Sequence, residues 1–211
     1  MSAAAGLIGP GEIFTLFFVT LGPLKVLGPF AARTHDLEPA AARGIALRVF
    51  VLSLVALFAG GWIGRALAAN WEISRAALLI TAGVIFFLVA LRVVLEQYEA
   101  PHAHQPEPLP AQPVAAALQL TYPTVVTPYG VAALVILLAS HRDVVRTEII
   151  FGALFGVMLL NLLAMLCARR VVHGVVALGL RLLGAVLGVM QVALAVQIIL
   201  FALRELELIR G

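Results

Sequence analysis

Two proline-containing segments interrupt stretches that are otherwise long and apolar enough to cross a membrane. One runs from Pro23 to Pro29 inside residues 13–31, and the other runs from Pro123 to Pro128 inside residues 114–140. A proline removes a backbone donor and clashes with the carbonyl four residues earlier. In hydrocarbon the freed carbonyl must be satisfied by protein or trapped water. Broken helices at matching places in two halves of a chain indicate a substrate site of the kind found in transporters.

The composition predicts an all-α polytopic membrane protein. Of the 211 residues, 63% are hydrophobic and only 12% are charged, so a soluble domain could not hide the apolar surface. A span needs about 20 mainly apolar residues. Six stretches qualify, and the third can be extended by its flanking arginines. They are residues 13–31, 44–64, 76–91, 114–140, 149–168 and 182–203.

Little of the sequence remains for a soluble module. The longest polar stretch, rich in proline, reads as a flexible connector over residues 98–113. No GxxxxGK[ST] phosphate loop is present, so ATP hydrolysis by this chain is not expected. The net charge of +3 reflects loop arginines, and no nucleic-acid partner is expected. The first residues lack a basic leader, so we expect the first span to be retained.

The spans divide into two sets of three, each opening with a proline-broken helix. Because each set has an odd number of spans, the halves cross in opposite senses, as in the inverted repeats of secondary transporters. We therefore predict a first half over residues 1–97 and a second over 114–211, within one membrane domain. Close helix packing is expected at Gly60-x-x-x-Gly64 and Gly152-x-x-x-Gly156. Seven arginines flank one membrane face and six the other, which favours external termini only weakly.

At the two breaks the chain resembles the MarC family of six-span bacterial inner-membrane proteins. The family's first span carries an Asn-Pro-Leu-Gly motif and then Pro-Phe, which here reads Gly22-Pro23-Leu24-Lys25 and then Pro29-Phe30. Its fourth span carries a proline and then Gly-Pro-Gly, which here reads Pro123 and then Thr127-Pro128-Tyr129. Its last span carries Arg-Leu-Leu-Gly, seen here from Arg181 to Gly184.

The resemblance implies a small-metabolite transporter or exporter. Some family members are described as neutral amino-acid transporters, and the family groups with the LysE-like exporters. This chain departs from the motifs at four positions, where it carries Gly22, Lys25, Thr127 and Tyr129. A cargo inferred from better-matching relatives therefore does not transfer directly to this chain.

Lys25 is the strongest single candidate for a functional residue. A charged side chain within a span normally faces a cavity or a partner. Glu12, about three turns away, is the nearest acid in the span. Lys25 could therefore meet a substrate carboxylate, a phosphate or water, and it could carry a coupling proton. The alternative is that Lys25 lies near the membrane edge and reaches the headgroups.

Other polar side chains gather around the breaks and in the later spans. Hydroxyls and unwound backbone are suited to binding a desolvated zwitterion or a sodium ion. The alternative is that threonines satisfy freed carbonyls, and that the span amides only form interhelical hydrogen bonds. The predicted substrate-binding set is Thr20, Pro23, Lys25, Thr121, Tyr122, Thr124, Thr127, Tyr129, Asn161 and Gln191. No catalytic or metal-binding residue is predicted, since His102 and His104 are too few for a metal site.

These observations favour a secondary transporter of small polar metabolites, neutral amino acids among them, working by alternating access in the bacterial inner membrane. The alternatives are an ion channel and a structural membrane protein without cargo. An enzyme is not expected, because Cys167 is the only cysteine and the spans lack a His and acid cluster. The expected partners are lipid and a small-molecule cargo, with homo-oligomerisation left open. No cofactor is expected, although H⁺ or Na⁺ could be a coupling ion.

Overall fold

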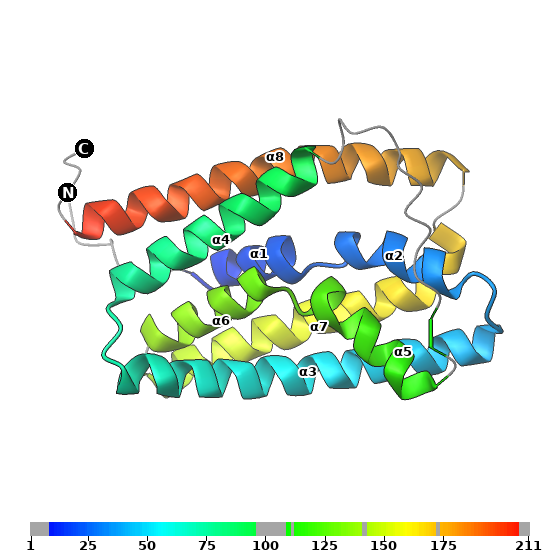
Figure 1. Ribbon diagram of the computed structural model, residues 1–211, viewed down its shortest axis with the longest axis horizontal. Helices are drawn as coiled ribbons and strands as arrows, with labels where there is room; N and C mark the ends of the chain where they lie inside the picture. The colour runs from blue at the N-terminus through cyan, green and yellow to red at the C-terminus, as the bar shows by residue number, and fades with distance from the viewer. Residues whose placement is uncertain (1–8, 96–108, 111, 141–142, 172–173, 207–211) are drawn as a thin grey trace.

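The computed structural model describes residues 9–95, 109–110, 112–140, 143–171 and 174–206. These residues form helices and loops without any strand, which confirms the all-α prediction. Figure 1 labels the elements in chain order. They are α1 (Pro10–Leu21), α2 (Leu24–Thr34), α3 (Pro39–Asn70), α4 (Arg75–Leu95), α5 (Pro113–Leu120), the π-helical turn η1 (Thr121–Val125), α6 (Pro128–Ser140), α7 (Val144–Val171) and α8 (Gly174–Glu205).

The helices account for five to six membrane crossings within the described residues. Five candidates qualify by length and composition: Ile13–Thr34, Pro39–Asn70, Arg75–Arg92, Val144–Ala168 and Gly188–Glu205. A sixth arises if the bent pair Pro113–Val125 and Pro128–Ala139 forms one span. The predicted ranges fall within α1–α2, α3, α4, α5–α6, α7 and α8, although several of these helices are longer than predicted. At 32 residues, α3 extends about 48 Å, beyond the roughly 30 Å hydrocarbon core.

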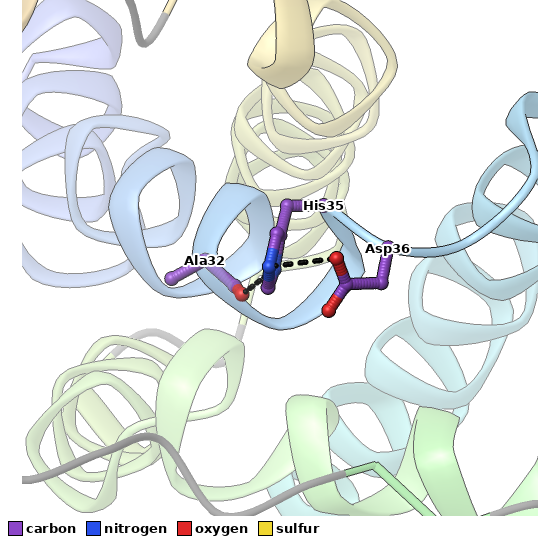
Figure 2. Close-up of polar contacts among 3 residues, drawn as sticks. All are labelled: Ala32, His35 and Asp36. Carbon is purple, nitrogen blue, oxygen red and sulfur yellow. Dashed lines mark hydrogen bonds and ion pairs between the residues drawn. The ribbon is translucent and has the colours of Figure 1, made fainter.

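Local sequence explains where several helices begin and end. Proline occupies the first turn of both α3 and α5, where its missing N–H costs no helical bond. After α2 ends, the His35 Nδ1 atom lies 2.8 Å from the Ala32 carbonyl oxygen. The His35 Nε2 atom also lies 2.9 Å from an Asp36 carboxylate oxygen (Figure 2). These exposed contacts lie at the turn that leads into α3.

The broken helices occupy the middle of the bundle. In Figure 1, α4 and α8 run along one side and α3 runs along the opposite side, with α1, α2, α6 and α7 between them. Ile13, Phe17 and Leu21 are fully buried at a spacing of four residues, so one face of α1 packs into the core. The α1 helix contacts α6 and α7, whereas α2 contacts η1 and α7.

Close helix packing was predicted correctly at one glycine pair and wrongly at the other. A Cβ atom on Gly64 would lie 2.4 Å from Val135 Cγ2, so α3 and α6 approach closely there. A Cβ atom on Gly152 would meet nothing within 4 Å, and one on Gly156 would lie 3.7 Å from Phe14 Cε2 of α1, an ordinary contact distance, so the second pair shows no close approach. An unpredicted close approach occurs at Gly83, whose Cβ would lie 2.5 Å from Ile199 Cγ1 on α8.

The predicted connector over residues 98–113 lies mostly outside the described residues. Of this range, only positions 109, 110, 112 and 113 are described. His102 and His104 therefore also lie outside the part of the chain described here.

Candidate functional site

The candidate site begins where the first span is interrupted. Helix α1 ends at Leu21 and α2 begins at Leu24, which leaves Gly22 and Pro23 between them. A Cβ atom on Gly22 would lie 1.7 Å from the Phe18 carbonyl oxygen, so only glycine fits this backbone. Pro23 has no N–H to offer the Val19 carbonyl four residues earlier. The last carbonyls of α1 therefore need donors from elsewhere.

Two amide side chains from the second half of the chain supply donors to this helix end. Gln191 Nε2 of α8 donates a hydrogen bond of 2.9 Å to the Val19 carbonyl. Asn161 Nδ2 of α7 donates one of 2.7 Å to the Leu21 carbonyl. Both side chains are almost completely buried. The structure therefore shows both side chains in interhelical hydrogen bonds. This is the simpler of the two roles that the sequence suggested for them, the other being substrate binding.

The carbonyl between these two, that of Thr20, has two donors. Thr127 Oγ1 donates to it at 3.2 Å, and Lys25 Nζ donates at 3.4 Å. Thr127 Oγ1 also accepts a 3.2 Å hydrogen bond from Gly130 N, so it caps the start of α6. One hydroxyl thus joins the C-terminal end of α1 to the N-terminal end of α6. Helix dipoles give these ends opposite partial charges.

The second interruption changes the direction of the chain. The segments Pro113–Val125 and Pro128–Ala139 meet at an angle of 67°. The η1 turn between α5 and α6 contains a non-helical residue, Tyr122, and Val126 N donates to the Thr121 carbonyl at 2.8 Å. This bend places Thr127 and Tyr129 against the end of α1.

Lys25 and Tyr129 form the main contact between the two broken helices. Lys25 Nζ donates a hydrogen bond to the Tyr129 hydroxyl and lies 4.4 Å from the centroid of its ring. The Tyr129 ring also stacks on Phe86 of α4, with centroids 5.1 Å apart. Tyr129 therefore lies between a cation on α2 and an aromatic ring on α4. The ammonium gains both a hydrogen bond and a cation–π contact from one side chain.

A cavity of about 450 Å³ adjoins this contact. It lies between α1, α4, α6 and α8, and its lining is mostly aliphatic and aromatic. Four lining residues are polar: Thr20, Arg75, Tyr129 and Gln197. The volume is in the usual range of about 300–1,000 Å³ for small-molecule sites. The cavity thus ends at the same Tyr129 that contacts Lys25.

Six members of the predicted substrate-binding set meet at this place, and the rest lie around it. Thr20, Lys25, Thr127, Tyr129, Asn161 and Gln191 all touch the end of α1 or its neighbours. Pro23 lies within the break itself.

The remaining three predicted residues belong to the turn between α5 and α6. The Thr121 hydroxyl turns back to the Ala117 carbonyl, at 2.8 Å. Tyr122 is 60% exposed, and Thr124 is partly buried. The Thr121 hydroxyl thus bonds within its own helical segment, and among the described residues no hydrogen bond joins Tyr122 or Thr124 to the cluster.

Sequence reasoning did not single out Phe86 or include Arg75 in the site, whereas Gln197 was considered with Asn161 and Gln191 as a residue that could line the cavity. Phe86 lies in a uniformly apolar helix, where no pattern distinguishes the residue that faces the cavity. Arg75 was interpreted as an anchor at the end of a span, and it also lines the cavity. Among the described residues, no three His, Cys, Asp or Glu side chains gather as they would for a metal ion.

Comparison with known proteins identifies the family. The family described as MarC family integral membrane protein matches residues 11–206. A UPF0056 membrane protein of the archaeon Methanocaldococcus jannaschii is 25% identical over 193 residues, which are 90% of this chain and 94% of the relative. No solved structure matches the chain significantly. The expected resemblance is thereby confirmed, and the chain is a multi-pass integral membrane protein that belongs to the MarC family.

Proposed function

We propose that this protein is a secondary transporter or exporter of small organic metabolites that carry a carboxylate, neutral amino acids among them. The observation that carries the proposal is the meeting of two interrupted helices beside a cavity, with the Lys25 ammonium at the junction. Transport sites are commonly built from interrupted helices whose ends face the substrate. Nothing in this arrangement calls for a chemical step, so we propose a carrier rather than an enzyme.

We propose that the carrier is built as an inverted repeat of three plus three spans. The first unit comprises α1–α2, α3 and α4, and the second comprises α5–α6, α7 and α8. Supporting this, corresponding helices pack on each other, α3 against α7 and α4 against α8. In Figure 1, α1 and α2 run from left to right whereas α5 and α6 run from right to left, and α1 contacts α6. Alternating access would rock one unit against the other around the central site.

The closed contact at Tyr129 favours a carrier over an open channel. The stacked rings of Phe86 and Tyr129 line the cavity, and Lys25, which is not a lining residue, contacts Tyr129. A cargo in the cavity would have to displace Tyr129 to reach Lys25. Such a barrier is expected in a carrier that is open to one side only. For the location we propose the bacterial inner membrane, whose proteins span as helices rather than as barrels.

Flux measurements in proteoliposomes test the proposal. Purified protein is reconstituted, and counterflow is measured with a panel of radiolabelled amino acids and organic acids. We expect saturable uptake of at least one panel member, reduced by an excess of the unlabelled compound. Non-saturating flux would indicate a channel instead. A folded protein that moves no member of the panel would contradict the proposal.

Substitutions at the junction show whether the measured flux uses this site. Lys25→Met removes the ammonium, and Tyr129→Phe removes only the hydroxyl while retaining the ring. Both are expected to lower counterflow at least tenfold, whereas Thr121→Val, a buried substitution within the η1 turn, leaves it within about twofold. Detergent-solubilised variants are checked by size-exclusion chromatography, so that loss of folding is separated from loss of flux. Equal effects of all three substitutions would contradict the assignment.

A further inference from the structure

The walls of the cavity are apolar along most of their length. Leu79, Phe86, Leu137, Ile198 and Phe201 are among the residues that line it, and they come from three different helices. A cargo whose polar atoms pointed at these walls would lose hydrogen bonds to water without replacement. The walls therefore favour a cargo with a sizeable apolar body.

Basic side chains lie near both ends of the cavity. Arg75 lines the cavity at the first residue of α4, and Lys25 lies behind Tyr129 near the other end. On α4, Arg75 and Phe86 are eleven residues apart, which corresponds to about 16 Å. An anionic group entering past Arg75 would thus travel about half of a membrane thickness to reach the Phe86–Tyr129 contact.

Arg75 is incompletely neutralised by its surroundings. A guanidinium nitrogen, Nη1, lies 3.8 Å from a Glu205 carboxylate oxygen, a long ion pair, and the group lies 5.9 Å from the centre of the Phe201 ring. Its Nε atom is buried and has no hydrogen-bond partner among the described residues. A buried donor without an acceptor is costly. The Arg75 side chain as a whole is 37% exposed, so a carboxylate in the cavity can pair with the accessible part of the guanidinium.

The site offers little to a cargo ammonium group. No described lining residue is an aspartate or a glutamate. The Thr20 carbonyl, the acceptor nearest the inner end, already receives hydrogen bonds from Thr127 and Lys25. An ammonium would also be repelled by the Arg75 guanidinium, and the Glu205 carboxylate beside it is already paired, which leaves the neutral Gln197 amide oxygen as a lining acceptor. A net negative cargo is therefore preferred to a zwitterion of the same shape.

We propose that the cargo class is amphipathic monocarboxylates: molecules with one carboxylate and an apolar body, such as branched or aromatic 2-oxo acids. The carboxylate binds first at Arg75 and then at the inner end formed by Tyr129 and Lys25, while the apolar body lies along the walls. This inference rests on the proposed transport function and narrows its cargo. It excludes small polar amino acids as the preferred substrates.

Three compounds separate the contributions of charge and apolar body. 4-Methyl-2-oxopentanoate carries both features, pyruvate keeps the charged head with a small body, and leucine keeps the body as a zwitterion. Counterflow is measured at pH 7.5, with protein-free liposomes to subtract passive permeation of the neutral acid. We expect kcat/KM for 4-methyl-2-oxopentanoate to exceed that for each of the other two by at least about tenfold. Pyruvate loses the apolar contacts, since each buried methylene contributes several-fold. Leucine keeps those contacts, but its ammonium meets no carboxylate among the described lining residues.

The outcomes distinguish this inference from the broader proposal. Preferred transport of alanine, serine or leucine would overturn the cargo class and leave the transport function standing. Transport of pyruvate as good as that of 4-methyl-2-oxopentanoate would remove the role of the apolar walls. Absence of flux for every compound, including the wider amino-acid panel, would contradict the transport function itself.

A matched pair of arginine substitutions tests the entry step. Arg75→Gln is expected to raise KM for 4-methyl-2-oxopentanoate about tenfold with little change in kcat, because the cation acts on binding from outside the inner site. Arg65→Gln is the control, since Arg65 contacts Trp62 near the end of α3 and does not line the cavity. It should leave KM unchanged. An unchanged KM in Arg75→Gln, or an equal rise in both variants, would overturn the role of Arg75.

Discussion

Replacing Thr127 by valine tests how the two interrupted helices are joined. The substitution keeps the shape of the side chain and removes two hydrogen bonds of 3.2 Å, one from Gly130 N and one to the Thr20 carbonyl. Loss of a helix cap costs about 1 kcal/mol, and loss of an interhelical bond in a membrane costs about 0.6 kcal/mol. The Thr20 carbonyl keeps Lys25 Nζ at 3.4 Å, so it is not left without a donor. We therefore expect a destabilisation of about 1.5 kcal/mol.

Thr121→Val is the matched control, because Thr121 is as buried as Thr127 and lies six positions earlier. Its hydroxyl bonds back to the Ala117 carbonyl within the same helical segment. Loss of this hydroxyl should therefore lower the free energy of unfolding by less than about 0.5 kcal/mol. The free energy of unfolding is measured in mixed micelles by SDS titration, with helix content followed by circular dichroism. Equal destabilisation by the two substitutions would refute the reasoning.

A double-mutant cycle makes the test sharper. Lys25→Met alone removes the cost of holding an ammonium inside the membrane, so its own effect on stability has no fixed sign. Combined with Thr127→Val, it leaves the buried Thr20 carbonyl without either of its donors. An unsatisfied buried acceptor costs about 1–3 kcal/mol, so the double variant should be less stable than the sum of the singles by that amount. Additivity within error would show that the two donors do not share this carbonyl.

Four further substitutions address the packing and the other donors. Gly64→Ala should destabilise by about 1–3 kcal/mol in the same assay, because its Cβ meets a valine methyl of α6, whereas Gly152→Ala should be neutral or slightly stabilising. Gly83→Ala should weaken the packing of α4 on α8 by a similar 1–3 kcal/mol, seen as faster proteolysis and a lower unfolding midpoint. Asn161→Leu should cost about 1 kcal/mol, because the Leu21 carbonyl loses its donor while a buried, unpartnered Oδ1 atom is also removed.

The interruptions were predictable from the sequence because their cause is local. Pro23 lacks an N–H wherever it lies, so a helix end in need of donors follows from the sequence itself. The length and apolarity of the spans are likewise direct properties of composition. Lys25 could be selected because a charge within an apolar stretch stands out on its own.

The identity of the donors and the cavity walls depended on tertiary structure. Asn161 meets a carbonyl 140 positions earlier in the chain, and no local pattern specifies that meeting. Tyr122 and Tyr129 were equally good candidates by sequence, but the η1 turn between them alters which face each presents. Tyr122 is consequently exposed, and Tyr129 is buried. Phe86 could not be distinguished from the other apolar residues of α4, because a helix that is apolar on all sides carries no directional signal.

The fastening of the α1 terminus has a mechanical consequence. The side chains of Thr127, Asn161 and Gln191 bind three successive carbonyls at the end of α1, and α2 also packs on α7. The first crossing is thus fastened to the second half of the chain on both sides of Gly22. If one unit rocks against the other as proposed, these hydrogen bonds must break and re-form in every transport cycle.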